Sequence, residues 1–274
     1  MLKEMYARAK KCPKNIVFPE GNDNRVKKAI EIIKRKKIAI PLVLKTGTIQ
    51  ERLNEGMEMV AKDQADGLIS GATHPTSWII LSAIKHIGLI PGIRKISGAF
   101  LMEINKRKFI FADCAVIPTP NPKELAEIAF LSANTFESLT KEKARVAMLS
   151  YSTNGSGKGK PVDIVKKAME IVKKYPINVV GEIQADAAVI PEIAKRKGAK
   201  GKGNANVLIF PDLNSGNISY KLVQRLTNSK AIGPLLQGLK KPVNDLSRGS
   251  NAEEIVDVAA ITCVQAQKKW KYSF

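Results

Sequence analysis

Short apolar runs alternate along this chain with longer stretches in which apolar residues recur every three or four positions. Short runs rich in Val, Ile, Leu and Phe predict β-strands, and a period of about 3.6 residues predicts amphipathic helices. The expected strands are 16–18, 67–70, 96–102, 108–112, 146–150, 179–184, 207–210 and 231–237. The expected helices are 25–36, 50–62, 76–86, 121–136, 161–174, 191–197, 217–226 and 251–269.

This alternation predicts an α/β fold with a mostly parallel sheet. The segments 96–102 and 108–112, joined through Asn105-Lys106-Arg107, predict an antiparallel hairpin. In parallel sheets, ligands bind beyond the carboxyl ends of the strands. Candidate site residues are therefore sought in the loops that follow the strands, which are 19–22, 70–76, 150–160, 184–187, 211–217 and 240–250.

Composition excludes several protein classes. The 274 residues are 44% hydrophobic and 26% charged, which is typical of a globular protein. No apolar run approaches the roughly 18 residues of a spanning helix, and the start of the chain lacks the apolar core of a secretory signal. Three scattered cysteines and two histidines favour neither a disulfide framework nor a metal centre. We expect a protein of the reducing cytoplasm, with no membrane partner.

The net charge of +20 adds a preference for anions. Such a balance attracts nucleic acid, anionic lipid or small phosphorylated ligands. However, 35 of the 45 cationic residues are lysines spread along the chain, and aromatic residues make up only 5% of it. This pattern favours solvated lysine surfaces, which are compatible with a small anionic ligand. It does not favour dedicated nucleic-acid binding, which uses aromatic stacking platforms.

The segment 242–254 is the most informative part of the sequence. Ser250 and Glu253 have the spacing of a capping box at a helix start. Arg248 precedes that start, so its guanidinium and free backbone N–H groups would converge on an anion. Glu254 lies one turn inside the helix and is not needed for that cap. The alternative for Glu254 is a solvated carboxylate that the helix dipole stabilises.

Two further loops carry groups suited to an oxyanion or a phosphate. Residues 150–156 combine hydroxyls with glycine directly after a strand, although a plain polar loop has the same composition. Residues 210–221 supply Asn and Ser, for which helix capping is the alternative role. No P-loop, dinucleotide fingerprint or nucleophile elbow is present in the sequence.

These residues carry a resemblance to the phosphate acetyltransferase (phosphotransacetylase) family. It rests on seven blocks in order: 17–21, 65–72, 97–102, 111–116, the Ser152-Thr153 loop, 210–222 and 243–249. The resemblance implies two α/β domains, similar to those of isocitrate and isopropylmalate dehydrogenases, with a cleft between them and usually in a dimer. We assign residues 1–95 plus 238–274 to the first domain and 96–237 to the second.

The implied reaction converts acetyl-CoA and phosphate to acetyl phosphate and CoA, without a metal or prosthetic group. By position in the motifs, Ser247 would hold the CoA thiol or the developing oxyanion, Arg248 would bind phosphate and polarise the acyl carbonyl, and Glu254 would be the base for the thiol. The expected substrate-binding residues are Ser152, Thr153, Gly155, Ser156, Asn214 and Asn244. No protein nucleophile is required, so Cys114 and Cys263 are expected to be buried small apolar residues.

The chain departs from the family pattern around phosphate. Leu81 and Ser82 stand where relatives carry an Arg-Pro pair, and Ile117 replaces the usual Asn. The region 45–64 is also several dozen residues shorter than in relatives, which have another arginine there. Lys85, Arg94 or Arg25 are candidate replacement cations. Two alternatives stay open: a non-catalytic homologue that binds CoA or an acyl phosphate, and a phosphate acyltransferase for a longer acyl group.

Overall fold

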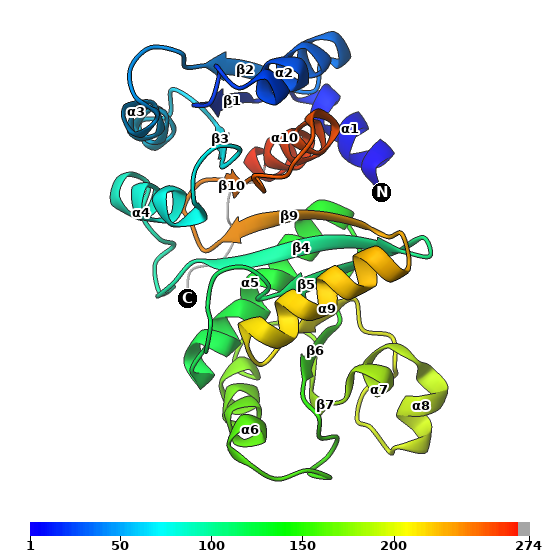
Figure 1. Ribbon diagram of the computed structural model, residues 1–274. Helices are drawn as coiled ribbons and strands as arrows, with labels where there is room; N and C mark the ends of the chain where they lie inside the picture. Colours follow the sequence, from blue (N-terminus) through cyan, green and yellow to red (C-terminus); the bar gives the residue numbers. More distant parts are fainter. Residues whose placement is uncertain (268–274) are drawn as a thin grey trace. The chain divides into compact units, whose positions relative to one another are not determined.

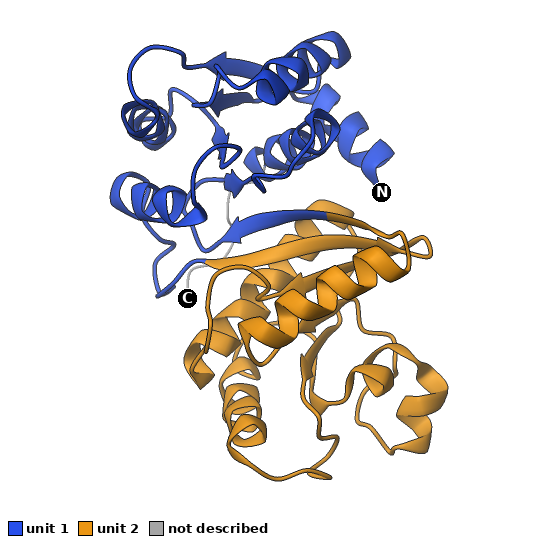
Figure 2. Cartoon of the chain, in the orientation of Figure 1, with its two compact units in different colours: residues 1–96, 232–274 blue, residues 97–231 orange. Residues whose placement is uncertain are grey.

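The computed structural model describes residues 1–267, which form two compact units. Unit 1 comprises Met1–Ile96 and the segment from Ile232 on, and unit 2 comprises Ser97–Ala231 (Figure 2). The first segment of unit 1 ends at Ile96, one residue after the expected boundary at residue 95. The return to unit 1 falls after Ala231 instead of after residue 237, because strand β9 (Lys230–Gln237) pairs with a strand of unit 1.

Unit 1 is built on strands in the order β2-β1-β3-β10-β9. The first four are parallel and β9 is antiparallel to β10. Besides β9, the strands are β1 (Asn15–Phe18), β2 (Ile40–Val43), β3 (Gly67–Ser70) and β10 (Val243–Asp245). The helices are α1 (Leu2–Lys11), α2 (Asn24–Lys36), α3 (Ile49–Ala61), α4 (Thr76–His86) and α10 (Ala252–Ala266). Helix α10 packs against α1, α2 and the strands β1, β3 and β10 (Figure 1).

Unit 2 repeats this architecture with strands in the order β4-β5-β8-β6-β7. The expected hairpin of β4 and β5 is antiparallel, and the remaining pairs are parallel. The strands are β4 (Ser97–Ile104), β5 (Arg107–Ala112), β6 (Val146–Leu149), β7 (Val179–Ile183) and β8 (Val207–Ile209). The helices are α5 (Pro122–Thr140), α6 (Lys160–Val172), α7 (Ala185–Val189), α8 (Pro191–Arg196) and α9 (Leu213–Leu226).

Helix α5 shows how sequence dictates burial in unit 2. It is apolar or small on nearly every face, and most of its residues are buried. Such a helix belongs in a core rather than at a surface, and α5 packs on β5, β8 and α6 (Figure 1). Helix α9 contributes an aromatic contact: its Tyr220 stacks on Phe100 with ring centroids 3.9 Å apart. The α/β fold expected from the alternation is thus confirmed.

Four elements were not predicted from the pattern: α1, β2, α7 and β10. Strand β2 is apolar but contains Pro41, which weakens a strand signal, and β10 reads Val-Asn-Asp, which is not an apolar run. Both strands form because parallel neighbours supply their hydrogen bonds, β1 for β2 and β3 for β10. Helix α9 begins at Leu213 and not at Asn217, because Asp212 caps it by accepting from the Ser215 N–H. The expected end of the last helix, Lys269, lies outside the described residues.

Candidate active site

The turn between β10 and α10 presents two of the expected catalytic residues to solvent. Ser247 and Arg248 follow β10 and are exposed. The Ser250 N–H donates to the Ser247 carbonyl at 2.9 Å, and the Gly249 N–H donates to Ser247 Oγ at 3.2 Å. Within residues 1–267, the Arg248 guanidinium makes no hydrogen bond or ion pair. An anion can therefore reach it without displacing a partner.

Helix α10 is capped differently from the expectation. The capping box joins Asn251 to Glu254, not Ser250 to Glu253. Glu254 Oε2 accepts from the Asn251 N–H at 3.0 Å, and Asn251 Oδ1 accepts from the Glu254 N–H at 2.9 Å. The prediction that Glu254 is not needed for the cap was wrong, because the helix starts one residue later than expected, with Asn251 instead of Ser250 as its N-cap. Glu254 is exposed and has a second carboxylate oxygen left for chemistry.

A buried carboxylate shapes the neighbouring β3–α4 loop. Glu20 accepts from the backbone N–H groups of Gly71, Ala72 and Thr73 at 2.8, 3.0 and 2.6 Å, and His74 Nδ1 lies 3.0 Å from its Oε1. Burial acts to raise the pKa of Glu20, but the hydrogen bonds to this loop outweigh it and lower the pKa to about 2. The sequence showed Glu20 only as part of a turn.

Asp245 links the same loop to β10. Its side chain is buried, and Oδ2 accepts a hydrogen bond from Thr76 Oγ1 at the start of α4. Burial raises the pKa of Asp245 to about 7. A Cβ atom on residue 71 would lie only 2.1 Å from Asp245 Oδ1, and Gly71 has φ +115°. Only glycine fits there, so the β3–α4 loop approaches the strand that carries Ser247 and Arg248.

The position at which the resemblance implies an arginine is exposed on α4. Leu81 is 67% exposed, and Ser82 Oγ donates to Asn54 Oδ1 of α3 at 2.8 Å. Lys85 is exposed one turn further along the same helix. Arg52 of α3 offers no replacement, since it is buried and donates to the carbonyls of residues 19, 45 and 47. Lys85 is the cation nearest along α4 to Leu81.

The expected Asn244 contact with substrate is not supported. Asn244 is fully buried, and its Nδ2 donates to Thr262 Oγ1 at 2.8 Å and to Gln265 Oε1 at 2.6 Å. Its Oδ1 accepts from the Leu236 N–H at 3.1 Å. These bonds join β10 to α10 and β9, and they leave no accessible polar atom for a ligand.

In unit 2, an internal carboxylate already occupies the donors of the 150–156 loop. Glu182 Oε1 accepts from Ser152 Oγ at 3.1 Å and from the Gly155 N–H at 2.5 Å, and Lys166 Nζ lies 4.0 Å away. Ser152 Oγ also accepts from the Gly157 N–H at 3.0 Å. Glu182 therefore takes the place that an oxyanion was expected to fill at Ser152 and Gly155. Sequence reasoning missed Glu182 because it lies 27 or more residues from the loop.

The other expected residues of unit 2 divide by exposure. Thr153 is buried, with Oγ1 donating to Gln184 Oε1 at 3.3 Å. Ser156 is exposed, and its Oγ accepts from the Thr153 N–H at 3.0 Å. Asn214 is exposed at the start of α9. Only Ser156 and Asn214 of this group offer side chains to solvent.

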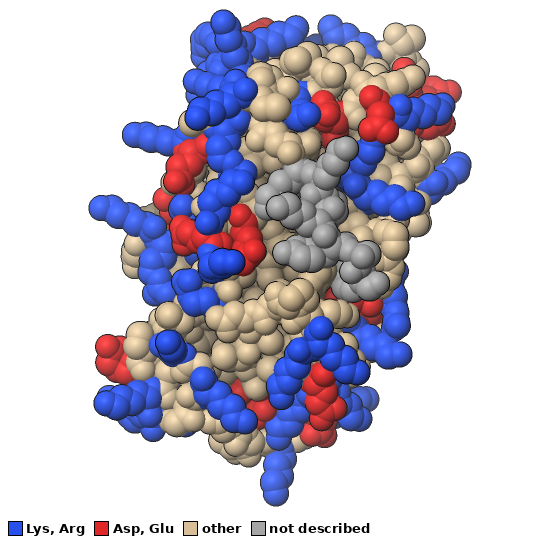
Figure 3. Space-filling view, turned by 180° about the vertical axis from the view of Figure 1, so that it is seen from behind, with Lys and Arg blue, Asp and Glu red and all other residues tan. Residues whose placement is uncertain are grey.

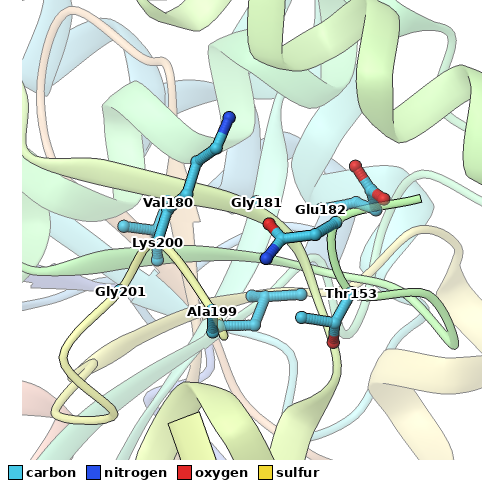
Figure 4. A pocket seen from close by; sticks show the side chains of 9 residues that line it. Thr153, Val180, Gly181, Glu182, Ala199, Lys200 and Gly201 are labelled. Atoms are coloured by element: carbon cyan, nitrogen blue, oxygen red, sulfur yellow. The ribbon is translucent and has the colours of Figure 1, made fainter. Parts of the chain in front are cut away.

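A small crevice lies beside the same loop. Figure 4 shows Thr153 and Glu182 on one side of it and Ala199, Lys200 and Gly201 on the other, and the space between them has no room for a water-sized sphere. Ligand pockets usually measure about 300–1,000 Å³. The crevice is therefore too small for a CoA-sized molecule.

The β5–α5 loop of unit 2 is organised by Asp113. Its buried carboxylate accepts from three successive N–H groups, those of residues 115–117. Burial raises the pKa of both Asp113 and Cys114. A Cβ on Gly216 would lie 2.1 Å from the Asp113 carbonyl, so α9 begins in close contact with this loop. Cys114 is fully buried, as is Cys263, which confirms their expected packing role.

Positive charge is spread over the surface. Figure 3 shows Lys and Arg distributed over one face, with Asp and Glu between them. Among residues 1–267, no three His, Cys, Asp or Glu side chains come together in a way that could hold a metal ion. In the same range, every helix is too short or too polar to cross a membrane.

Comparison with known proteins places this geometry in one family. A family model described as phosphate acetyl/butaryl transferase matches residues 1–55 and 45–263. The phosphate acetyltransferase of Thermoanaerobacterium thermosaccharolyticum is 48% identical over 243 residues, covering 85% of this chain and 74% of that protein. A phosphotransacetylase structure from Streptococcus pyogenes superposes with a TM-score of 0.89 at 36% identity, covering 97% of this chain and 99% of that one.

A third relative bears on the shortened region. The phosphate acetyltransferase of Acetivibrio thermocellus is 39% identical, and the alignment covers 97% of this chain and 98% of the relative. It extends over 326 positions against the 274 residues of this chain, so at least 52 positions of the alignment are gaps in this chain. The two segments matched by the family model overlap at residues 45–55, within the region expected to be shorter than in relatives. The chain belongs to the phosphate acetyl/butaryl transferase family.

Proposed function

We propose that this chain is a phosphate acetyltransferase, which converts acetyl-CoA and phosphate to acetyl phosphate and CoA. The observation that carries the proposal is the turn at Ser247 and Arg248, exposed at the start of α10 with the Arg248 guanidinium unpaired in the described chain. The relatives named phosphate acetyltransferase that match nearly the whole chain support it.

Arg248 would stabilise the charge that develops in the reaction. Attack of a phosphate oxygen on the thioester carbonyl gives a tetrahedral oxyanion, and fixed positive charge and N–H donors stabilise it. Arg248 supplies the charge, and the N-terminus of α10 adds the positive end of its dipole. Ser247 Oγ already accepts from the Gly249 N–H. Its hydroxyl hydrogen would therefore point to the CoA sulfur or the oxyanion.

Glu254 would act as the base in the direction that consumes acetyl phosphate. A CoA thiol titrates near pH 8.5, so a carboxylate removes its proton uphill and depends on Arg248 to stabilise the thiolate. The capping bond from Asn251 fixes one oxygen of Glu254, which sets the direction of the other. This assignment gives Glu254 a structural and a chemical role at once.

The unit 2 residues are proposed in two roles. Ser156 and Asn214, which are exposed, would contact substrate directly. Ser152, Thr153 and Gly155 would position the loop that carries Ser156, through their bonds to Glu182 and Gln184. For phosphate, Lys85 would supply part of the charge that Leu81 lacks.

We further propose a homodimeric cytoplasmic enzyme that uses no metal or prosthetic group. The thioester is already activated, so the transfer needs positioning and charge but no cofactor. The three cysteines are free thiols, which supports a reducing compartment. Three apolar side chains, each one turn from the next on α9, are more than half exposed and support contact with a second copy: Ile218, Leu222 and Leu226.

The decisive experiment follows thioester loss from acetyl-CoA with and without phosphate. Phosphate-dependent loss together with formation of acetyl phosphate is expected. Binding of CoA by calorimetry without turnover at any phosphate concentration would favour the non-catalytic homologue. Absence of CoA binding would leave only a resemblance of fold.

A further inference from the structure

The guanidinium of Arg25, in the first turn of α2, uses every N–H donor that it has. Nε and one Nη2 hydrogen bind the Asp23 carboxylate at 3.2 and 2.9 Å, and the other Nη2 hydrogen binds the Ala72 carbonyl at 2.8 Å. The two Nη1 hydrogens bind the carbonyls of Arg248 and Ser250 at 2.6 and 3.1 Å. An arginine has five such donors, so none is left over.

This saturation argues against Arg25 as the replacement cation for phosphate. A phosphate oxygen would have to displace a carbonyl or the Asp23 carboxylate, and a hydrogen bond to a charged group is costly to lose. Asp23 is itself fixed, because it caps α2 by accepting from the N–H groups of Arg25 and Val26. The ion pair raises the pKa of Arg25, so the guanidinium stays charged.

The bonds of Arg25 join three loops of unit 1. Asp23 belongs to the β1–α2 loop, Ala72 to the β3–α4 loop, and Arg248 and Ser250 to the β10–α10 turn. The carbonyls of Arg248 and Ser250 lie on either side of Gly249. Through these two carbonyls the Arg25 side chain holds the backbone of the turn. The side chain of Arg248 itself makes no bond within the described chain, so its direction depends on this backbone.

We propose that Arg25 is a positioning residue for acyl transfer, which acts by fixing the backbone of the Ser247–Ser250 turn and so the direction of Arg248. The inference rests on the proposed function. A displacement of about 1 Å at a catalytic group can cost about 100-fold in rate. Lysine cannot replace Arg25, because its three donors on one nitrogen do not reproduce the planar fork.

The test compares Arg25→Lys and Arg25→Ala with wild type, with Arg35→Ala as the matched control. Arg35 is exposed at the other end of α2. Both Arg25 variants should lower kcat about 10- to 100-fold, with the KM values for acetyl-CoA and for phosphate changed much less. Amide hydrogen exchange of residues 247–251, measured by mass spectrometry, should accelerate in both variants. Arg35→Ala should match wild type in every measurement.

The outcomes separate positioning from direct binding. If Arg25→Lys retains kcat, the planar fork is not needed and the inference is overturned. If the loss in either variant appears as a selective rise in KM for one substrate, Arg25 contacts that substrate, which also overturns it. If wild type shows no phosphate-dependent thioester loss, the proposed function fails on its own. Hydrogen exchange then decides the positioning role alone, and exchange at 247–251 that is unchanged in the variants would overturn it.

Discussion

Asn251 and Glu254 exchange hydrogen bonds at the start of α10, each side chain accepting from the backbone N–H of the other. This reciprocal pair closes the first turn of the helix that follows Arg248. It means that the carboxylate proposed as the base is held in place by the same geometry that begins the helix. Substitutions at residue 254 therefore affect two properties, which can be separated by experiment.

Glu254→Gln should preserve the cap and remove the base. Glutamine satisfies a capping box, so the melting temperature should stay close to that of wild type. The rate of the reaction of acetyl phosphate with CoA should fall most at neutral pH, and raising the pH should partly restore it as more CoA thiolate forms unaided. Glu254→Ala should lose both the rate and about 0.5–2 kcal/mol of stability. Glu253→Gln, at the exposed neighbour, is the control, and equal activity of Glu254→Gln and wild type at pH 7 would restrict Glu254 to capping.

Arg248→Ala should abolish acyl transfer without affecting folding. Removing a charged oxyanion donor costs at least about 3 kcal/mol of transition-state stabilisation, which corresponds to a loss of more than 100-fold in kcat. The side chain is exposed and unpaired in the described chain, so the unfolding midpoint in urea should not move. Steady-state rates and urea unfolding check the two halves of this prediction. Normal turnover in the folded variant would contradict the role of Arg248.

Leu81→Arg should improve the use of phosphate. Wild type is expected to need unusually high phosphate for saturation, because Leu81 stands where the resemblance implies an arginine. An added charged hydrogen bond of roughly 1.5–3 kcal/mol should lower the KM for phosphate by about 10- to 100-fold. Initial rates across a phosphate series check this, with Ile190→Arg as a control for added surface charge. A low phosphate KM in wild type would show that another cation already compensates, and Lys85→Ala would then be expected to raise it.

Asp245 should make stability fall as pH rises from about 4 to about 7. Burial raises its pKa from the ordinary 3.8 to about 7, so within this window the folded chain holds a proton that the unfolded chain has released. The melting temperature of Asp245→Asn, minus that of wild type, should therefore increase across the window and level off above it. Glu20, whose pKa is lowered to about 2, loses its contribution only below pH 4.5 and does so in both proteins. A flat difference for Asp245→Asn would contradict the prediction.

Glu182→Ala should loosen the 152–157 loop. The substitution leaves Ser152 Oγ, which is fully buried, without its acceptor and frees the Gly155 N–H. An unsatisfied buried polar group costs roughly 1–3 kcal/mol, so trypsin should cut faster after Lys158. Glu192→Ala, at an exposed residue of α8, is the control. Unchanged cleavage in Glu182→Ala would show that the loop keeps its conformation without the carboxylate.

The alternation of strands and helices, the α/β class and the start of α5 follow from the sequence alone. Asn121 was expected to open a helix, and it caps α5. Capping and periodicity depend on residues within one or two turns, so a single stretch of sequence contains the information they need. Arg248 was also expected just before a helix start, because the position of that start follows from the local sequence.

Contacts between distant segments were decided by the tertiary structure. Strand β10 forms although its sequence is polar, because β3 and β9 flank it. Once β1, β3 and β10 are adjacent, Glu20 meets the 71–74 loop and Arg25 meets a turn 223 residues away. In unit 2, the pairing of β6 with β7 brings Glu182 to Ser152 in the same way. No local pattern specifies these pairs, because their hydrogen bonds exist only after strand order has placed the loop ends side by side.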